Sequence, residues 1–446
     1  MTAPLTDCAV LLDRRRLIAG LGAAALLAAL PQPLIAATAR AATLRAGKGL
    51  AALREGHPDT SVARLSALPP DAALRFRRGD ELALRLENGL AEPAIFGWRG
   101  IADSRAEPLL VRRAIASGGS DSFAVTLRHA GTALIDLRLL GDGGPEPLPA
   151  RAMIVEETEP VAVDRDKVLL IEDWRLAPDG RALAPGRDAP DTKEAATFYT
   201  VNGVAAFELK IRAGQRLRLR FINGCQRSIA AIKIEDHDCQ VMAIDGQPAE
   251  PFAARGGQLL LGPGTRIDGF VDALRPPGSR AAILLHDGST ARPIARLVYS
   301  DEPPIRSGAL QAAAALAGNG LPAQLDLKAA QRIELALDGP PPAWQRPADF
   351  NPAAAPAFHA KRGRVVVLAL SHRGAGPIVF HLHGHHFRLL DRLDDGWKPY
   401  WLDTLVVGPG QTQRVAFAAD NAGPWLIESM AAEWSAPRMV SHYVVD

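Results

Sequence analysis

The segment His381-Leu382-His383-Gly384-His385-His386-Phe387 places four histidines within six residues of an apolar, strand-like run. Side chains at alternate positions of a β-strand point to the same face, so His381 and His383 can reach one metal ion or one buried cluster. His385 and His386 are adjacent and cannot both join that face. A single buried histidine is more often an ordinary core residue, but this density of imidazoles indicates a metal-binding ancestry.

Outward from this segment, the chain repeats one pattern three times: a turn glycine followed by a strand with alternating apolar residues. The three glycines are Gly79, Gly214 and Gly363. The alternating residues after them are Leu82, Leu84 and Leu86; Leu217, Leu219 and Phe221; and Val365, Val367 and Ala369. The Ala-rich segment 308–316 is the main candidate helix. The pattern predicts an all-β protein built from three β-sandwiches.

The first 42 residues are predicted to be an export signal, because a charged segment is followed by an apolar run and small-residue cleavage sites. These parts are Arg14-Arg15-Arg16, residues 19–30, Ala37-Thr38-Ala39 and Ala39-Arg40-Ala41. The paired arginines before Leu17-Ile18 resemble a twin-arginine signal, which exports folded proteins, so we expect a periplasmic location. The alternative is an uncleaved anchor, but the apolar run is short for a membrane span. No other segment reaches transmembrane length, so we expect no transmembrane anchor after the signal is removed.

The net charge bears on nucleic acid as a partner, and the cysteine content bears on possible disulfide bonds. A formal net charge of +2 over 446 residues argues against nucleic acid as a partner. Cys8 lies in the predicted signal, which leaves Cys225 and Cys239 in the mature chain. We expect them to form a disulfide in an oxidising compartment, although their spacing neither demands nor excludes it.

The histidine segment resembles the third copper motif of multicopper oxidases, H-P-x-H-L-H-G-H. Three later segments are similar to landmarks of the same terminal domain: Asp403-Thr404, Pro409-Gly410 and Asp420-Asn421-Ala422-Gly423-Pro424-Trp425. The resemblance implies an all-β fold of three consecutive cupredoxin-like (plastocyanin-like) Greek-key β-sandwich domains. They would cover residues 43–160, 161–303 and 326–446, after a signal at 1–42 and with a linker at 304–325.

The resemblance also implies where copper ligands once stood. Family members collect electrons at a mononuclear copper ion and reduce oxygen at a trinuclear cluster. The former mononuclear positions are Ile378, Ser429, Trp434 and Met439. The first three offer neither thiolate nor imidazole, and a lone methionine is a weak ligand that more often fills a core. We therefore expect the mononuclear centre, and with it four-electron oxidase chemistry, to be lost.

The former trinuclear positions carry charges in place of most histidines. They are Gly97, Arg99, Asp136, Arg138, His381, His383, Glu428 and Met430. Carrying over the family's pairing predicts two buried ion pairs, Arg99–Asp136 and Arg138–Glu428, which would join the first and third domains. The alternative is that these charges face solvent.

We expect no cofactor, although two histidines survive. His381 and His383, with Asp136, Glu428 or Met430, remain a set that could hold one zinc or copper ion. Two nearby arginines would oppose such an ion.

The sequence favours an exported, copper-less relative of multicopper oxidases that acts as a periplasmic scaffold and binds another periplasmic or envelope protein. In this respect it resembles the SufI-like periplasmic proteins, an analogy at the level of the fold. One alternative is an oxidoreductase with a reduced metal site at His381 and His383. Another is a periplasmic binding protein for copper or a small ligand, although only five methionines are present to build a copper-handling surface.

Overall fold

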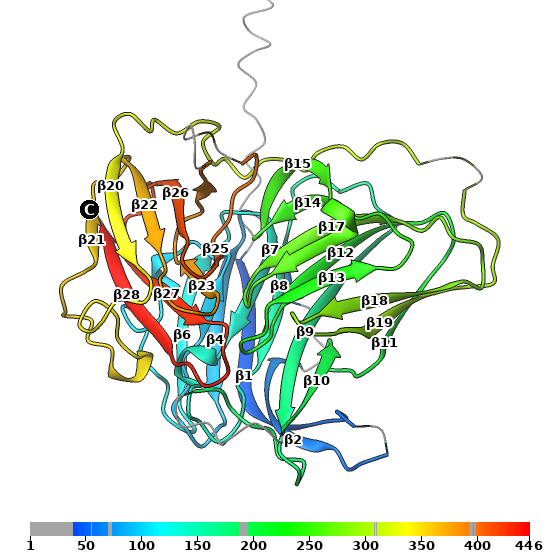
Figure 1. The fold of residues 1–446 in the computed structure, drawn as a ribbon, viewed down its shortest axis with the longest axis horizontal. Helices are drawn as coiled ribbons and strands as arrows, with labels where there is room; N and C mark the ends of the chain where they lie inside the picture. Colours follow the sequence, from blue (N-terminus) through cyan, green and yellow to red (C-terminus); the bar gives the residue numbers. More distant parts are fainter. Residues whose placement is uncertain are drawn as a thin grey trace, which may run out of the picture. The chain divides into compact units, whose positions relative to one another are not determined.

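The chain is folded almost entirely into β-strands (Figure 1). The computed structural model describes residues 39–54, 56–69, 74–186, 195–306, 308, 310–391, 396 and 398–446. Residues 1–38 of the predicted export signal lie outside this part, whereas its last four residues belong to the first strand, Ala39–Ala51. Within the described part, no helix has the length and apolar character needed to cross a membrane.

The first sandwich consists of two four-stranded sheets, ordered β2-β1-β4-β6 and β3-β8-β7-β5. Its strands are β1 (Ala39–Ala51), β2 (Thr60–Leu68), β3 (Arg75–Arg77), β4 (Glu81–Asn88), β5 (Gly97–Arg99), β6 (Ser120–Thr126), β7 (Gly131–Asp136) and β8 (Ala150–Glu156). Two 3₁₀ turns, η1 (Ser104–Ala106) and η2 (Arg138–Leu140), belong to the same region.

The second sandwich pairs a six-stranded sheet, ordered β10-β9-β12-β17-β14-β15, with a five-stranded sheet, ordered β11-β19-β18-β13-β16. Its elements are β9 (Arg165–Leu176), β10 (Ala196–Val201), β11 (Phe207–Ile211), β12 (Arg216–Asn223), β13 (Ala230–Ile234), β14 (Gln240–Ile244), β15 (Gln247–Ala253), η3 (Arg255–Gly257), β16 (Gln258–Leu261), β17 (Arg266–Asp272), β18 (Arg280–His286) and β19 (Ala291–Tyr299).

The third sandwich pairs the sheets β20-β22-β26-β24 and β21-β28-β27-β23-β25. Its elements are β20 (Gln331–Ala336), η4 (Pro347–Asp349), β21 (Phe358–Ala360), β22 (Val365–Ser371), β23 (Ile378–Leu382), β24 (Arg388–Leu389), β25 (Thr404–Val407), β26 (Thr412–Ala418), β27 (Gly423–Ala431) and β28 (Arg438–Val445). The predicted all-β class with three consecutive sandwiches is therefore confirmed.

The repeated glycine-and-strand pattern marks the same place in each sandwich. Strands β4, β12 and β22 each pair in parallel with the first strand of their sandwich and antiparallel with a later one. The preceding Gly79, Gly214 and Gly363 have φ angles of 93°, 82° and 82°. Glycine adopts this left-handed conformation without the steric penalty that a β-carbon would bring. Each glycine thus turns the chain into the central strand of its sheet.

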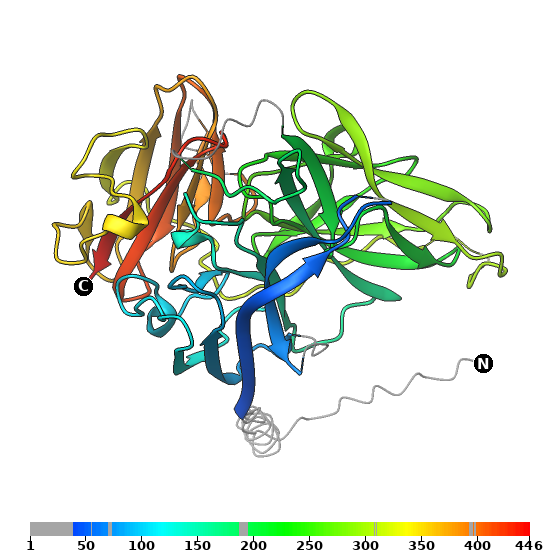
Figure 2. The same cartoon turned by 90° about the horizontal axis from the view of Figure 1, so that it is seen from below.

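The hairpin of β1 and β2 connects the first two sandwiches (Figure 2). Its far end carries Ala51, Leu53 and Val62, which pack in one buried cluster with Trp174 and Leu176 of β9. The hairpin therefore extends the first sandwich onto the second.

The predicted disulfide is wrong, because Cys225 and Cys239 are both free and buried. The Cys225 thiol lies 3.8 Å from the Ile171 carbonyl oxygen of β9, whereas the Cys239 sulfur lies against Gly269 of β17. Strand β12 separates β9 from β17 in the sheet, so the two sulfurs approach opposite neighbours of that strand. Burial raises the pKa of Cys239 to about 12 and the pKa of Cys225 well above its ordinary value.

The candidate helix at 308–316 is also wrong, since its described residues, 308 and 310–316, have no regular secondary structure. A helix this short is marginal in water unless one face packs on a core. Most of these residues are exposed, so no such packing supports it.

Candidate functional site

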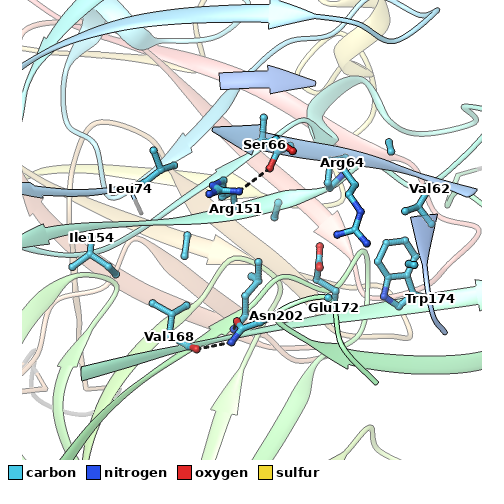
Figure 3. Close-up of a pocket in the computed structure, with 18 of the residues that line it drawn as sticks. Val62, Arg64, Ser66, Leu74, Arg151, Ile154, Val168, Glu172, Trp174 and Asn202 are labelled. Carbon is cyan, nitrogen blue, oxygen red and sulfur yellow. Dashed lines mark hydrogen bonds between the residues drawn. The ribbon is translucent and has the colours of Figure 1, made fainter. Parts of the chain in front are cut away.

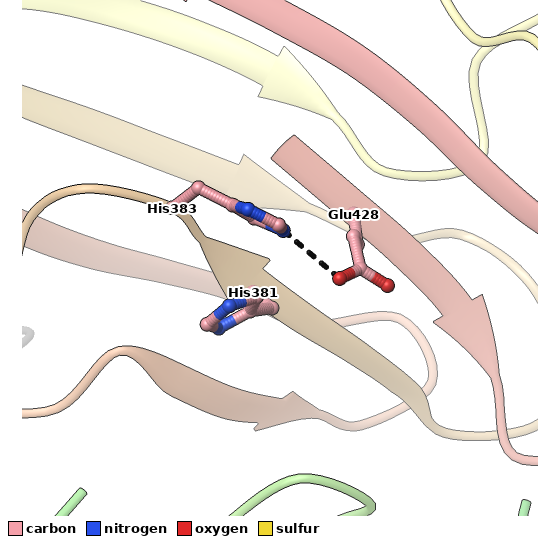
Figure 4. Close-up of side chains that lie close together, drawn as sticks. All are labelled: His381, His383 and Glu428. Carbon is pink, nitrogen blue, oxygen red and sulfur yellow. Dashed lines mark hydrogen bonds and ion pairs between the residues drawn. The ribbon is translucent and has the colours of Figure 1, made fainter. Parts of the chain in front are cut away.

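The surviving histidines lie where the first and third sandwiches meet. His381 is on β23 and pairs across the sheet with Glu428 of β27, and His383 follows directly after β23. The two imidazole rings lie beside each other near Glu428, and the His383 ring points toward its carboxylate (Figure 4); their centres are 4.6 Å apart. The first sandwich contributes Arg99 from β5 and Asp136 from β7. All five side chains are buried.

Glu428 is the centre of the charged contacts. Its Oε1 accepts a hydrogen bond from Arg99 Nη2 at 3.1 Å and one from His383 Nε2 at 2.9 Å. Its Oε2 is paired with the guanidinium of Arg438, the first residue of β28. Burial alone would raise the pKa of Glu428, but Arg99 and Arg438 outweigh burial and hold it well below its ordinary value.

His383 is held between two carboxylates. Its Nδ1 lies 3.0 Å from Glu107 Oε1, and its Nε2 bonds Glu428. Burial lowers the pKa of this imidazole, but Glu107 and then Glu428 raise it to about 9. Because both ring nitrogens face acceptors, the imidazolium form donates two hydrogen bonds and keeps no lone pair free.

His381 is in the opposite state. Its Nδ1 donates to the backbone carbonyl of Asp403 at 2.9 Å, and its Nε2 is buried without a hydrogen-bond partner. Burial, and next the charge of Arg99, lower the pKa of His381 to about 3. His381 is therefore neutral and presents one unengaged nitrogen to the seam.

Three cations and three carboxylates form one charge-balanced group, which we call the interdomain cluster. Its members are Arg99, His383 and Arg438, and Glu107, Asp136 and Glu428. Glu107 follows η1 of the first sandwich and also accepts the Leu426 backbone amide of β27 at 2.9 Å. The cluster thus joins the first sandwich to the third through hydrogen bonds and ion pairs.

The predicted partners within this cluster need correction. Arg99 Nε lies 3.8 Å from Asp136 Oδ2, which is an ion pair longer than a hydrogen bond, and the guanidinium's shorter contact is with Glu428. The predicted Arg138–Glu428 pair is wrong. Arg138 turns to the second sandwich instead, where it bonds the backbone carbonyls of Gly224 and Cys225 and lies 3.6 Å from Glu172. Arg438 takes the place beside Glu428 that Arg138 was expected to occupy.

The other former trinuclear positions are spatially close but carry no charge. Gly97 pairs with Asp136 across β5 and β7, and a β-carbon on it would lie 3.3 Å from Asp136 Oδ1. Met430 is buried on β27 opposite Val379.

The former mononuclear positions are filled by packing and one hydrogen bond. Ile378 is buried on β23, and the Ser429 hydroxyl donates to the Leu337 carbonyl at 2.7 Å. The Trp434 ring lies beneath the Arg175 guanidinium at 4.6 Å. Met439 is half-buried against the hydrophobic core, the role typical of an isolated methionine.

His385 and His386 face separate partners, in agreement with their adjacent positions. His385 Nδ1 bonds the Tyr443 hydroxyl at 2.7 Å, whereas His386 Nε2 bonds the Asp245 carbonyl at 3.1 Å.

A second buried ionic group beside His381 was not predicted. Arg266 of β17 makes two hydrogen bonds, of 2.9 and 2.7 Å, to the carboxylate of Asp403. Asp245 Oδ2 accepts the backbone amides of Asp403 and Thr404, each at 3.0 Å. These contacts tie the second sandwich to the third. Arg266, Glu107 and Arg438 do not lie in copper-motif positions. The one signal in the sequence is that Arg438 directly precedes Met439, a former mononuclear position.

His381, His383 and Glu428 are the described residues whose ligand atoms come close enough to hold one metal ion, within 4.8 Å of one another. In this structure, however, both nitrogens of His383 and both oxygens of Glu428 already face charged partners. One unengaged lone pair, on His381 Nε2, remains. This donor set does not fit a copper ion unless Arg99 and Arg438 move away.

Comparisons with known proteins agree with the architecture. Two family models described as multicopper oxidase match residues 165–290 and 324–446. The multicopper oxidase MmcO of Mycobacterium tuberculosis is 26% identical over 431 residues, which cover 83% of this chain and 81% of that protein. The copper resistance protein A homolog of Pseudomonas syringae pv. tomato is 24% identical over 41% of this chain and 39% of its own length.

Solved structures extend the likeness to about nine tenths of the chain. A multi-copper oxidase from Pseudomonas thermotolerans has a TM-score of 0.77 and 25% sequence identity, covering 92% of this chain and 100% of that one. Lac15 from a marine microbial metagenome, at 22% identity and a TM-score of 0.73, covers the same shares and shows the likeness of fold.

Proposed function

Because the chain belongs to the multicopper oxidase family, we propose that it is a member in which the interdomain cluster has replaced the copper cluster and which acts as a non-catalytic exported scaffold. The observation that carries this proposal is the state of Glu428. Its two oxygens contact Arg99, His383 and Arg438. Positively charged side chains of the protein therefore stand where the family binds copper ions.

The chemistry of the substituted positions supports the same conclusion. A blue copper site needs a thiolate and imidazoles, and Ile378, Ser429 and Trp434 supply neither. Two guanidinium groups within the cluster would also repel a divalent ion at His381 and His383. Without an electron-accepting centre, the family's oxidase reaction has no entry point for electrons.

The retained fold and the contacts between its sandwiches support the scaffold role. The three sandwiches keep the family's arrangement, and the hydrogen bonds and ion pairs of the cluster join the first to the third. We propose that the protein is exported by the twin-arginine route to the periplasm and there binds another periplasmic or envelope protein. The predicted signal at residues 1–42 supports the location.

The test is metal analysis of protein produced in copper-supplemented cells. We expect less than stoichiometric copper, no blue absorption band and no oxidation of a phenolic substrate, with a copper-loaded multicopper oxidase as the positive control. A blue band together with phenol turnover would refute the proposal.

One observation favours a second candidate, an oxidoreductase with a single metal ion. The unengaged Nε2 of His381 lies within a group of three possible ligands. For this candidate we expect one equivalent of zinc or copper, without a blue band, that is lost in His381→Ala and retained in a His359→Ala control, because His359 is exposed and lies outside the cluster.

A further inference from the structure

A cavity of about 380 Å³ lies in the seam between the first and second sandwiches (Figure 3). Strand β2 and strand β8 form its walls on one side, and strand β9 with the turn at Asn202 and Gly203 forms the other. None of its lining residues belongs to the interdomain cluster or to the former copper positions. Its volume is that of an ordinary small-molecule site.

One end of this cavity is apolar. Leu74, Ile154 and Val168 lie together there (Figure 3). Such a surface gains free energy when it covers an apolar group and removes it from water.

The other end is polar and has an aromatic wall. Arg64 of β2 and Glu172 of β9 point toward each other across it, beside the ring of Trp174 (Figure 3). The Trp174 indole nitrogen donates to Thr200 at 2.9 Å, which fixes the ring in place. The rigid ring supplies a flat apolar contact surface, and the guanidinium beside it supplies the charge that attracts an anion.

The lining residues of the whole cavity carry more positive than negative charge. Three arginines and one carboxylate line the cavity: Arg64, Arg75, Arg151 and Glu172. Arg75 lies 3.5 Å from both Glu156 and Asp166, and Glu172 lies 3.6 Å from Arg138. Arg64 donates to the Leu50 carbonyl, and the Glu172 carboxylate that it faces is shared with Arg138, so two guanidinium groups stand against one carboxylate at the polar end.

We propose that this cavity binds a small organic anion with an apolar body. Its carboxylate or sulfonate would pair with Arg64 beside Trp174, and its apolar part would lie between Leu74, Ile154 and Val168. Guanidinium binds such oxygen pairs in a fork, whereas a neutral polar ligand would gain only ordinary hydrogen bonds there.

The experiment uses anilinonaphthalene sulfonate, an amphipathic anion that fluoresces in apolar surroundings, with the full mature chain. We expect saturable binding to one site and about tenfold or greater weakening in Arg64→Gln, since that variant loses the charge-assisted hydrogen bonds to the anion. Arg64→Lys should retain most of the affinity. Arg296→Gln, which removes an exposed arginine from strand β19, is the matched control and should bind as the wild type does.

Two further measurements separate this site from general hydrophobic binding. Phenylbutyrate should displace the dye, whereas the uncharged phenylbutanol should not. Ala152→Phe, which places a ring in the cavity wall, should abolish binding while the melting temperature shows that the protein remains folded. Equal affinity in Arg64→Gln, equal displacement by the alcohol, or no saturable binding would overturn the proposal.

Discussion

At the scale of single residues, Glu428 decides the electrostatics of the seam between the first and third sandwiches. It faces three cations, and each of them is buried. Placing ions in a low-dielectric interior is costly, and the balance of three positive and three negative groups offsets that cost. Removing one charged member should therefore lower the free energy of unfolding more than removing an oppositely charged pair.

This imbalance predicts the effect of removing Glu428 alone. Glu428→Leu should lower the free energy of unfolding by about 3–5 kcal/mol, because Arg99, His383 and Arg438 lose their shared partner. The double variant Glu428→Leu/Arg438→Met should lower it less, since two cations and two carboxylates remain. Urea unfolding of both variants measures the difference, with the exposed Glu334→Gln as a control. A double variant less stable than the single one would refute the shared-partner explanation.

The raised pKa of His383 predicts a dependence of stability on pH. The unfolded imidazole titrates near 6.5 and the folded one at about 9, so its contribution is complete below pH 6.5 and is lost as pH rises through 9. The loss should be roughly 3 kcal/mol. Urea unfolding of metal-free protein at several pH values should show this decrease.

The matching control is His383→Gln, which has no proton to release in this range. Its free energy of unfolding should fall much less between pH 6.5 and 9 than that of the wild type. Equal slopes in the two proteins would mean that His383 is not the titrating group.

The sequence located the residues of this site but not their partners. The motif positions placed Arg99, His381, His383 and Glu428 in one seam, because strand register fixes which face each side chain occupies. The sequence does not predict in which direction a long side chain extends from its strand. Arg138 follows β7 and turns to the second sandwich, while Arg438 and Glu107 enter the seam from positions outside the copper motifs.

At the scale of elements, strands were easier to predict than the remaining segments. Alternating apolar residues and a turn glycine specify β4, β12 and β22 locally, so the sequence is sufficient for them. The Ala-rich segment at 308–316 has high helix propensity, but helix formation depends on packing that its residues do not provide. The predicted disulfide was wrong for a similar reason. The spacing of Cys225 and Cys239 in the sequence does not show that their sulfurs contact β9 and β17, which lie on opposite sides of β12.

Strand β7 also sets the contact between the first and second sandwiches, through Gly131. This glycine has a φ of 143°, and a β-carbon on it would lie 2.2 Å from the carbonyl oxygen of Gly246. Gly131→Ala should therefore lower the free energy of unfolding by more than about 2 kcal/mol. Gly47→Ala is the matched control, because a β-carbon there has no heavy atom within 4 Å. Thermal unfolding compares the two, and equal melting temperatures would contradict the close approach.

At the scale of the whole molecule, contacts between the protein's own groups join all three sandwiches. The interdomain cluster joins the first to the third, Arg266 and Asp245 join the second to the third, and the β1–β2 hairpin joins the first to the second. Such an assembly can be complete before export, which suits a route that carries folded proteins.

The export proposal predicts the behaviour of the paired arginines. Arg14→Lys/Arg15→Lys should leave uncleaved precursor in the cytoplasm, because the twin-arginine route requires that pair. Immunoblots of periplasmic and cytoplasmic fractions measure it, with Arg45→Lys, beyond the signal, as the control. Normal processing of the double variant would instead indicate ordinary secretion or an anchor.

The two buried thiols have a consequence for how the second sandwich can be observed. A thiol reacts through its thiolate, and burial with a raised pKa suppresses that form in Cys225 and Cys239. A maleimide can therefore label either cysteine only during the moments when the surrounding strands separate. The described part of the chain has no other cysteine. The labelling rate therefore measures how often the second sandwich opens locally under native conditions.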